Sequence, residues 1–319
     1  MKVNKTIYKC DYFTVEELAS GVYGAFATEE GGALSNSGVI DLGEKTVVFD
    51  TFLSADAASE LRKFAERQTG RKVSFVVNSH CHFDHTLGNC AFDNDTAIIT
   101  TKKILQELKA HEGELTGMKK QAPQILTSLR ESLASEADEM SKKMLERDIR
   151  YFEMLNSESF SLRLPDITFE DSYAVEGTSR KVLLIETEGH TGSDIMLYLP
   201  EEKIAFTGDL LFTGTHPWLG AGDPEQWINT LHGLQNYELQ LLLPGHGYAG
   251  RTSDVTLLEE YIRMIEAIAV KVAGGEYKAE DLGEEMLKAP FKDWKGNKFL
   301  PNVKFYIEYM KRDTGKVKK

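Results

Sequence analysis

The chain has 319 residues, of which 41% are hydrophobic and 27% charged, a composition typical of globular proteins large enough to bury a substantial core. Its net charge of −13 argues against general nucleic-acid binding, because an acidic surface repels a phosphate backbone. Three cysteines, Cys10, Cys81 and Cys90, form neither a disulfide framework nor a paired CxxC metal motif. No apolar run is long enough to span a membrane, and the residues after Met1 do not resemble a signal peptide. We therefore expect a soluble, cytoplasmic protein.

The N-terminal third of the chain predicts strands around one helix. Short runs rich in valine, isoleucine and phenylalanine predict β-strands at residues 38–42, 46–50, 73–77 and 97–100. Residues 55–69 carry apolar side chains at helical spacing and end at Gly70, which predicts an amphipathic helix.

The character of the sequence changes between about residues 102 and 160, where apolar side chains recur every three or four positions. This period predicts a helical insertion. We expect Gly113, Gly117 and Pro123 to divide it into at least two helices. The insertion is a lid or a dimerisation arm over the active site in one interpretation, and a helical layer packed on the sheet in the other. Periodicity alone does not separate the two.

Strand patterns return in the second half, at residues 166–169, 181–186, 195–199, 203–206 and 239–243. After Gly250 the chain becomes helical again. Thr252, Ser253 and Asp254 are suited to cap a helix that Gly274 ends. We interpret residues 1–319 as a single domain, with a helical insertion at about 102–160 and a helical extension at about 252–319.

The most informative segment is Asn78-Ser79-His80-Cys81-His82-Phe83-Asp84-His85. It places three histidines and an aspartate within six residues, directly after a predicted strand. Alternate side chains of a loop can point into one pocket, so His80 and His82 can share a metal ion, while Asp84 and His85 turn toward an adjacent point. Imidazole and carboxylate groups together suit zinc and similar metals. By the same alternation, the Cys81 side chain points away from the ligands, and we expect it to serve packing.

Further ligand-type side chains follow other predicted strands, each beside a glycine. They are His190 in Gly-His-Thr, Asp209 in Thr-Gly-Asp, and His246 in Pro-Gly-His-Gly. Glycine allows a sharp turn and a close approach of the backbone to a buried ion. Four such strand ends in one chain indicate a metal centre.

The series HxHxDH, GHT, GD and PGHG resembles the motifs of the metallo-β-lactamase superfamily, in order and in rough spacing. The resemblance implies an α/β fold, the αββα sandwich, with the metal site at one edge of two sheets. It implies that one metal is bound by His80, His82 and His190, a second by Asp84, His85 and His246, and that Asp209 bridges them. Asp50 matches an aspartate that supports the ligand loop.

The resemblance implies a binuclear metal-dependent hydrolase, in which a metal-bridging hydroxide attacks a small ester, thioester or lactone. Asp84 could orient the nucleophile and carry a proton, and Tyr248 and His216 are candidate acids for the leaving group. Two zinc ions per chain are expected, although the same ligands accept iron or manganese. Both glyoxalase-II-like and lactonase-like members use the complete ligand set, so the subfamily stays open.

Three alternatives remain at this point. A mononuclear iron-dependent oxidoreductase, such as a persulfide dioxygenase, would use the same fold but needs fewer protein ligands. A phosphodiesterase would use both metals. A non-catalytic scaffold would more commonly have lost ligands. We expect a small-molecule substrate, no nucleic-acid or membrane partner, and either a monomer or a homodimer formed through the insertion.

Overall fold

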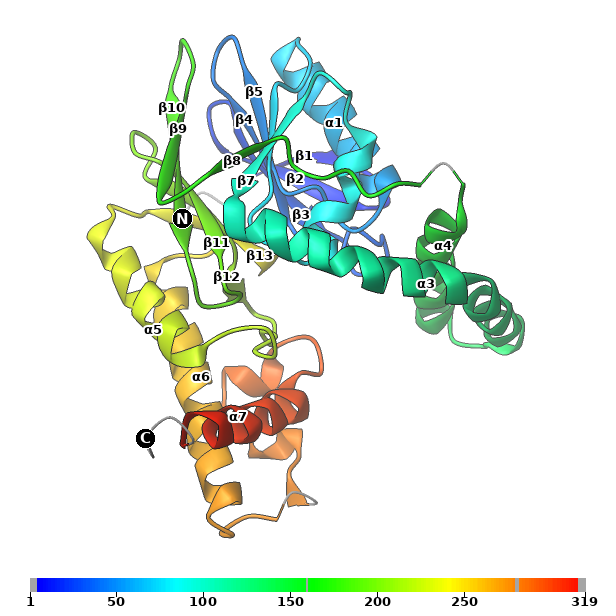
Figure 1. Ribbon diagram of the computed structural model, residues 1–319, viewed down its shortest axis with the longest axis vertical. Helices are drawn as coiled ribbons and strands as arrows, with labels where there is room; N and C mark the ends of the chain where they lie inside the picture. Colours follow the sequence, from blue (N-terminus) through cyan, green and yellow to red (C-terminus); the bar gives the residue numbers. More distant parts are fainter. Residues whose placement is uncertain (1–4, 159, 279–280, 315–319) are drawn as a thin grey trace.

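The computed structural model describes residues 5–158, 160–278 and 281–314. Two β-sheets form the centre of the fold (Figure 1). The first sheet contains eight strands in chain order: β1 Thr6–Lys9, β2 Phe13–Ala19, β3 Val22–Ala27, β4 Ser37–Asp41, β5 Thr46–Phe49, β6 Phe75–Val77, β7 Ala97–Thr101 and β8 Ile167–Phe169. The second sheet, in the order β13-β12-β11-β10-β9, contains β9 Ser172–Glu176, β10 Lys181–Thr187, β11 Asp194–Leu199, β12 Ile204–Thr213 and β13 Leu241–Gly247.

The inner faces of the two sheets pack against each other. Val47 and Phe49 of the first sheet share one buried cluster with Leu197 and Phe206 of the second. The rings of Phe49 and Phe206 lie 5.9 Å apart. A Cβ atom at Gly38 would lie 2.1 Å from the Phe206 ring, so only glycine fits at this point of β4. Burial of these apolar side chains fixes how the two sheets are placed relative to each other.

Helices cover the outer faces. Helix α1, Ala55–Thr69, packs Leu61 and Phe64 onto the first sheet, and the helix begins where the Ser54 side chain accepts the Ala57 N–H. Helices α5, Pro224–Gly233, and α6, Thr252–Ala273, cover the second sheet through Trp227 and Tyr261. The layers are therefore helix, sheet, sheet, helix, as the family resemblance implies.

The remaining elements are short or peripheral: α2 Phe83–Thr86, α7 Phe299–Thr314, and the 3₁₀ turns Leu87–Ala91, Leu234–Asn236, Glu284–Met286 and Phe291–Asp293. Helix α6 ends at Gly274 as predicted, and at its start the carboxylate of Asp254 accepts the Arg251 N–H at 2.8 Å. In the described part of the chain, no helix is both long and apolar enough to cross a membrane.

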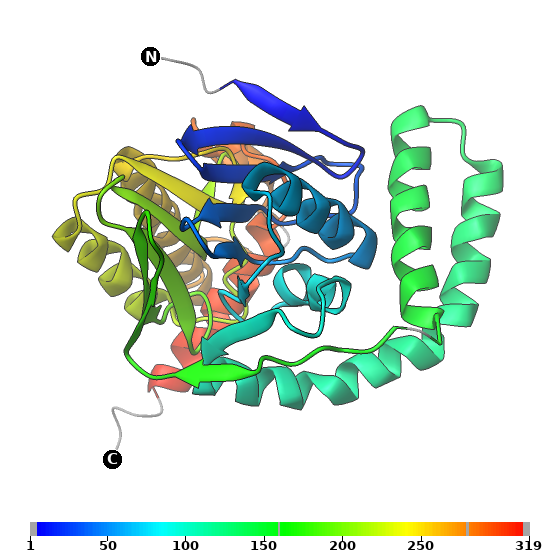
Figure 2. The same ribbon diagram turned by 90° about the horizontal axis from the view of Figure 1, so that it is seen from above.

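The helical insertion consists of α3, Lys102–Ser135, and α4, Glu139–Asn156. The prediction that Gly113, Gly117 and Pro123 divide the insertion is wrong, because α3 continues through all three residues. Figure 2 shows that α3 changes direction along its length and that its second part pairs with α4 in a projecting hairpin. A proline removes one intrahelical hydrogen bond and bends a helix without necessarily ending it.

Two strands are longer than their sequence pattern predicts. We expected Asp209 and His246 to follow strands that end at residues 206 and 243, but they lie within β12 and β13. The two strands pair in parallel, with register irregularities on either side of Gly208. Gly208 has φ +51°, a conformation that glycine adopts without strain. The irregular pairing lets an extended strand direct a ligand side chain out of the sheet.

Replacing Phe206 with alanine should remove a buried aromatic contact between the two sheets. We expect Phe206→Ala to lower the free energy of unfolding by about 3–5 kcal/mol, measured by urea denaturation. Tyr173→Ala, at an exposed aromatic position of β9, should change it by less than about 1 kcal/mol. Equal effects of the two substitutions would contradict the assigned core.

Candidate metal centre

The ligand cluster begins where β6 ends. His80 and His82 lie in the loop that leaves β6, and Asp84 and His85 lie in α2. Cys81, between the two histidines, is buried in the cluster between the sheets. Burial raises the pKa of its thiol, so a thiolate ligand is disfavoured. The structure thus separates Cys81 from its neighbours, as alternation along the loop predicts.

The second sheet brings three more ligand-type residues to the same edge. His190 follows β10, Asp209 lies in β12, and His246 lies in β13. A Cβ atom at Gly245 would lie only 1.8 Å from a carboxylate oxygen of Asp209. The glycine before His246 therefore allows β13 to pass directly beside this carboxylate.

One set of side chains converges from both sheets. His80, His82, His190 and Asp209 each present one ligand atom, and these atoms lie within 4.8 Å of one another. His82 Nδ1 is 3.0 Å from His80 Nε2 and 3.1 Å from His190 Nε2. The Asp209 Oδ2 atom is 3.2 Å from His190 Nε2 and 3.8 Å from His80 Nε2.

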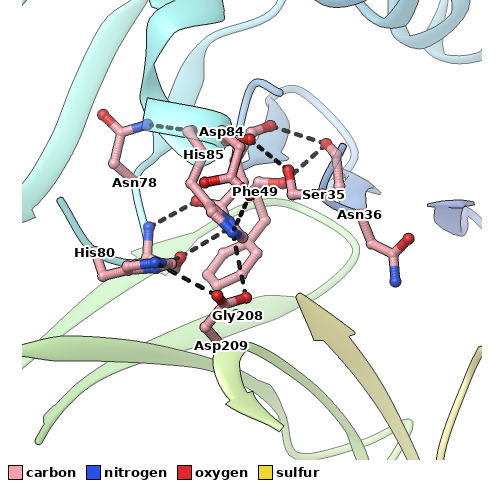
Figure 3. A network of polar contacts seen from close by, with 12 residues as sticks. Ser35, Asn36, Phe49, Asn78, His80, Asp84, His85, Gly208 and Asp209 are labelled. Atoms are coloured by element: carbon pink, nitrogen blue, oxygen red, sulfur yellow. Dashed lines mark hydrogen bonds and ion pairs between the residues drawn. The ribbon is translucent and has the colours of Figure 1, made fainter. Parts of the chain in front are cut away.

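A second set lies on the other side of Asp209. Asp84, His85 and His246 also present ligand atoms within 4.8 Å of one another. The Asp209 Oδ1 atom is 3.2 Å from His85 Nε2 and 3.4 Å from His246 Nε2. Figure 3 shows Asp209 between His80 and His85, with its two oxygens directed to different neighbours. One carboxylate therefore gives one oxygen to each set.

These distances fit divalent cations. Four ligands at zinc-bond lengths in a tetrahedron are separated by about 3.3 Å, close to the spacings within the first set. Among the described residues, His85 Nε2 and Asp209 Oδ1 are buried without a hydrogen bond, although they lie only 3.2 Å apart. Buried polar atoms are normally satisfied. The two atoms lie side by side without partners, as ligands of one ion would.

Asp50, directly after β5, supports His85 by a hydrogen bond and His80 through Ser79. Its carboxylate accepts hydrogen bonds from the Ser79 N–H, the Ser79 hydroxyl and His85 Nδ1, each at 2.7 Å. Because the Ser79 hydroxyl donates to Asp50, it must accept from His80 Nδ1 at 2.8 Å. Both histidines therefore carry hydrogen on Nδ1, which leaves Nε2 as the ring nitrogen that faces the ligand sets. Such contacts fix histidine tautomers in metal sites.

Sequence reasoning missed two further supports. Asp194 accepts the backbone N–H groups of His190 and Thr191, both at 3.1 Å. Asn36 donates to the carbonyls of Pro244 at 3.0 Å and Gly247 at 2.9 Å, on either side of His246. The position of Asp194, four residues after His190, could have indicated its role. Asn36 precedes His246 by 210 residues, so no local pattern connects the two.

Burial and the charges in the cluster shift the pKa values of the histidines in opposite directions. Burial and the neighbouring His190 lower the pKa of His82 to about 4. Burial also opposes charge on His246, but Asp209 and Asp84 outweigh it and raise the pKa of His246 to about 10. The same balance raises the pKa of His85 well above its ordinary value. In the metal-free chain, protons on His85 and His246 therefore partly neutralise the carboxylates.

A cavity of about 490 Å³ opens on the ligands. His82, Asp84, Asp209 and His246 form its floor, and its walls include Leu34, Phe83, Phe212, His216, Trp218 and Lys298. A larger cavity of about 870 Å³ adjoins it, since both are bordered by Leu34, Phe83 and Asp84. Arg147 and Tyr151 of α4 line this second cavity. The helical insertion therefore contributes a wall to a cavity beside the metal centre.

The two candidate acids lie in different places. His216 is buried, borders the cavity over the ligands, and places Nδ1 3.0 Å from the Tyr261 hydroxyl. Tyr248 is 54% exposed and lines a neighbouring groove that shares His246. Its hydroxyl donates to Asp254 at 3.0 Å, and burial together with Asp254 raises its pKa. His216 therefore borders the cavity over the ligands, whereas Tyr248 lies in the neighbouring groove.

Comparison with known proteins agrees with this fold. Residues 31–246 match the family model of the metallo-β-lactamase superfamily. The chain belongs to this superfamily. A probable metallo-hydrolase of Methanocaldococcus jannaschii is 27% identical over 232 residues, covering 69% of this chain and 90% of that protein. The metallo-β-lactamase from Pontibacter korlensis shares the fold, with a TM-score of 0.56, 18% identity, and coverage of 79% of this chain and 99% of that chain.

Two other relatives carry more specific names. A linear primary-alkylsulfatase of a Pseudomonas species is 22% identical over 246 residues, covering 72% of this chain and 44% of that protein. A hydroxyacylglutathione hydrolase of Bartonella henselae is 29% identical over 120 residues, covering 35% of this chain and 47% of that protein. The matched regions span about half the length of each. The relatives are named hydrolases of this superfamily, in agreement with the expected enzyme class.

Removing the support behind His85 should weaken metal binding more than folding. We expect Asp50→Ala to lower metal affinity about 10–100-fold, measured by competition with a chromogenic chelator. Asp95→Ala, at a largely exposed aspartate, should bind metal like the parent chain. Unchanged affinity in Asp50→Ala would contradict the supporting role.

Metal loading should release protons, because the metal must displace those held by His85 and His246. The raised pKa values imply that metal affinity rises with pH as both histidines lose their protons, and the pKa of His246 lies at about 10. Calorimetric titration of the metal-free chain in two buffers of different ionisation enthalpy should therefore show a net proton release near neutral pH. Loading without proton release would show that the two histidines are neutral beforehand.

Proposed function

We propose that the chain is a binuclear metal-dependent hydrolase of a small ester, thioester or lactone. The observation that carries the proposal is the placement of Asp209, whose two oxygens belong to different ligand sets. Each set contributes further donors with nitrogen or oxygen atoms directed to a common point. A site for a single ion would not require the second set of Asp84, His85 and His246.

The donor set suits zinc, with iron or manganese as alternatives that the same ligands accept. Two such ions supply a water of lowered pKa and a Lewis acid for the oxygen that gains charge. The residues of the chain orient the ligands and the water. Asp50 and Ser79 fix the histidine tautomers, and Asp84 stands at the junction of the two cavities, where it can hold a water by hydrogen bonding.

The cavities indicate a small substrate with an apolar part. The space over the ligands is about 490 Å³, the size of pockets that hold small organic molecules. The adjoining cavity of about 870 Å³ presents the apolar side chains of Leu53, Phe83 and Phe160 together with Arg147 and Arg150. A substrate can therefore place its reacting group at the ligands and its remainder beneath α4.

Sulfate-ester hydrolysis is the second candidate. The relative named as a linear primary-alkylsulfatase matches 72% of this chain, and the apolar cavity beneath α4 would accept an alkyl chain. An iron-dependent oxidoreductase is less well supported, because both ligand sets are intact.

Metal content and activity test this function together. Protein purified without added metal or chelator should contain close to two zinc ions per chain by elemental analysis, and it should hydrolyse members of an ester, thioester and lactone panel. Asp209→Ala should lower the metal content and reduce kcat by at least about 10³-fold, since the carboxylate serves both sets.

Cys81→Ala is the matched control, because this buried thiol points away from the ligands, and it should retain metal and activity. An active, fully metallated Asp209→Ala variant would contradict the shared-ligand assignment. One iron per chain with no zinc, and oxygen uptake in place of hydrolysis, would contradict the hydrolase.

A further inference from the structure

The segment Ser35-Asn36, directly before β4, lies beside two ligands of the second set. The Ser35 hydroxyl donates to the backbone carbonyl of Asp84 at 2.5 Å, and Figure 3 shows Ser35 beside Asp84. The Asn36 amide nitrogen donates to two carbonyls, at 3.0 and 2.9 Å, that lie on either side of His246 in the chain. The exposed fractions of Ser35 and Asn36 are 0% and 4%, so water competes little for these contacts.

The orientation of the Asn36 amide group follows from its partners. Its Oδ1 atom accepts the Ala27 N–H at 3.2 Å, so the amide nitrogen is the atom that faces the carbonyls of Pro244 and Gly247. The two hydrogens of that nitrogen match these two acceptors. The backbone N–H of Asn36 donates to the Gly245 carbonyl at 2.6 Å. One asparagine therefore binds the carbonyl groups of Pro244, Gly245 and Gly247.

These contacts matter because β13 is irregular close to His246. β13 is the edge strand of the second sheet, and β12 is its neighbour. Between Pro244 and His246 the register shifts, and a step of two residues along β13 corresponds to a step of four along β12. The ladder is therefore interrupted directly before His246. Hydrogen bonds to Asn36 satisfy the backbone there and hold this part of β13 to the first sheet.

The two ligand sets differ in how far packing alone fixes them. The side chains of His80 and His190 in the first set are 1% and 0% exposed. Those of Asp84 and His246 in the second set are 23% and 24% exposed. A side chain that is less closely packed keeps more rotational freedom, which metal binding must remove. The orientation of the second set therefore depends more on the hydrogen bonds that hold its backbone.

The first set is supported by other residues. Asp194 accepts the backbone N–H of His190 at 3.1 Å, and the Ser79 hydroxyl contacts His80 Nδ1 at 2.8 Å. The Ser35-Asn36 segment bonds instead to the backbone that carries the second set. Loss of its hydrogen bonds would therefore act on one set and leave the supports of the other in place.

We propose that Ser35 and Asn36 are positioning residues for the second ion: they determine how tightly Asp84 and His246 bind it, whereas the first set binds its ion without them. The inference rests on the binuclear function proposed above. Neither side chain belongs to a ligand set, so both residues act through the backbone of the ligands. Substitutions outside the ligand sets should therefore convert the chain from a two-ion to a one-ion protein.

Metal affinity tests the proposal. Competition with a chromogenic chelator should give two zinc dissociation constants for the parent chain. Asn36→Ala should raise one of them about 10–100-fold, the usual effect of losing an outer partner of a ligand, and change the other by less than about 3-fold. Ser35→Ala removes the contact to the backbone of Asp84 and should weaken the same ion by several-fold.

Asn302→Ala is the matched control. Asn302 in α7 is also a buried asparagine, and its amide group bonds to the backbone of Leu219 and Pro217. Its loss should lower the free energy of unfolding, as the loss of Asn36 does, because buried backbone groups lose a partner in both variants. It should leave both zinc dissociation constants unchanged. A merely structural role of Asn36 would make the two variants alike.

Histidine NMR identifies which ion is lost. Long-range ¹H–¹⁵N correlation of ¹⁵N-histidine protein, at a zinc concentration that saturates only the tighter site, should show metal-bound signals for His80 and His190 in Asn36→Ala. The His246 signal should be that of the metal-free ring. Excess zinc should restore the metal-bound signal of His246 and, with it, kcat on an ester that the parent chain hydrolyses. Asn302→Ala should show no such dependence on added zinc.

The outcomes separate this inference from the proposed function. Unchanged zinc affinities in both Asn36→Ala and Ser35→Ala, or equal weakening of both ions, would overturn the inference and leave the hydrolase proposal standing. A parent chain that binds a single ion would overturn the binuclear function, and the inference with it. If Asn36→Ala does not fold, Ser35→Ala decides the question by the same measurements.

Discussion

The arrangement of the metal centre depends on the buried carboxylate of Asp209, which needs positive charge around it. A carboxylate with almost no exposure is costly unless positive charge surrounds it. Histidines approach both of its oxygens, and the nearest nitrogens lie 3.2 Å away on either side. In the metal-free chain, protons on two of those histidines supply part of the charge. Divalent cations would replace those protons and satisfy the buried Asp209 oxygen and His85 nitrogen that otherwise make no hydrogen bond.

The fold brings ligand residues from two distant parts of the chain to the Asp209 carboxylate. The first sheet delivers the loop with His80 and His82, and the second delivers His190, Asp209 and His246. The apolar layer between the sheets, centred on Phe49 and Phe206, fixes the distance between the two halves. The polar supports behind the ligands then set orientation. Packing therefore decides where the ligands lie, and hydrogen bonding decides which atom each one presents.

The sequence predicted the parts of the structure that depend on local pattern. The bounds of α1 follow from helical periodicity and Gly70, and the ligand residues follow from their clustering after strands. The continuity of α3 through Pro123 was not predictable, because packing against α4 outweighs the local cost of a proline. The extension of β12 through Asp209 depends on parallel pairing with β13, a contact between segments far apart in the sequence. The roles of Ser35, Asn36 and Asp194 likewise depend on tertiary contacts that no motif records.

We propose that two metal ions share Asp209, one at each carboxylate oxygen. Crystals of zinc-loaded protein, measured at the zinc absorption edge, test it directly through anomalous scattering. Two anomalous peaks are expected, one at a bonding distance of about 2.0–2.2 Å from each Asp209 oxygen. A single peak, or two peaks of which only one touches Asp209, would contradict it.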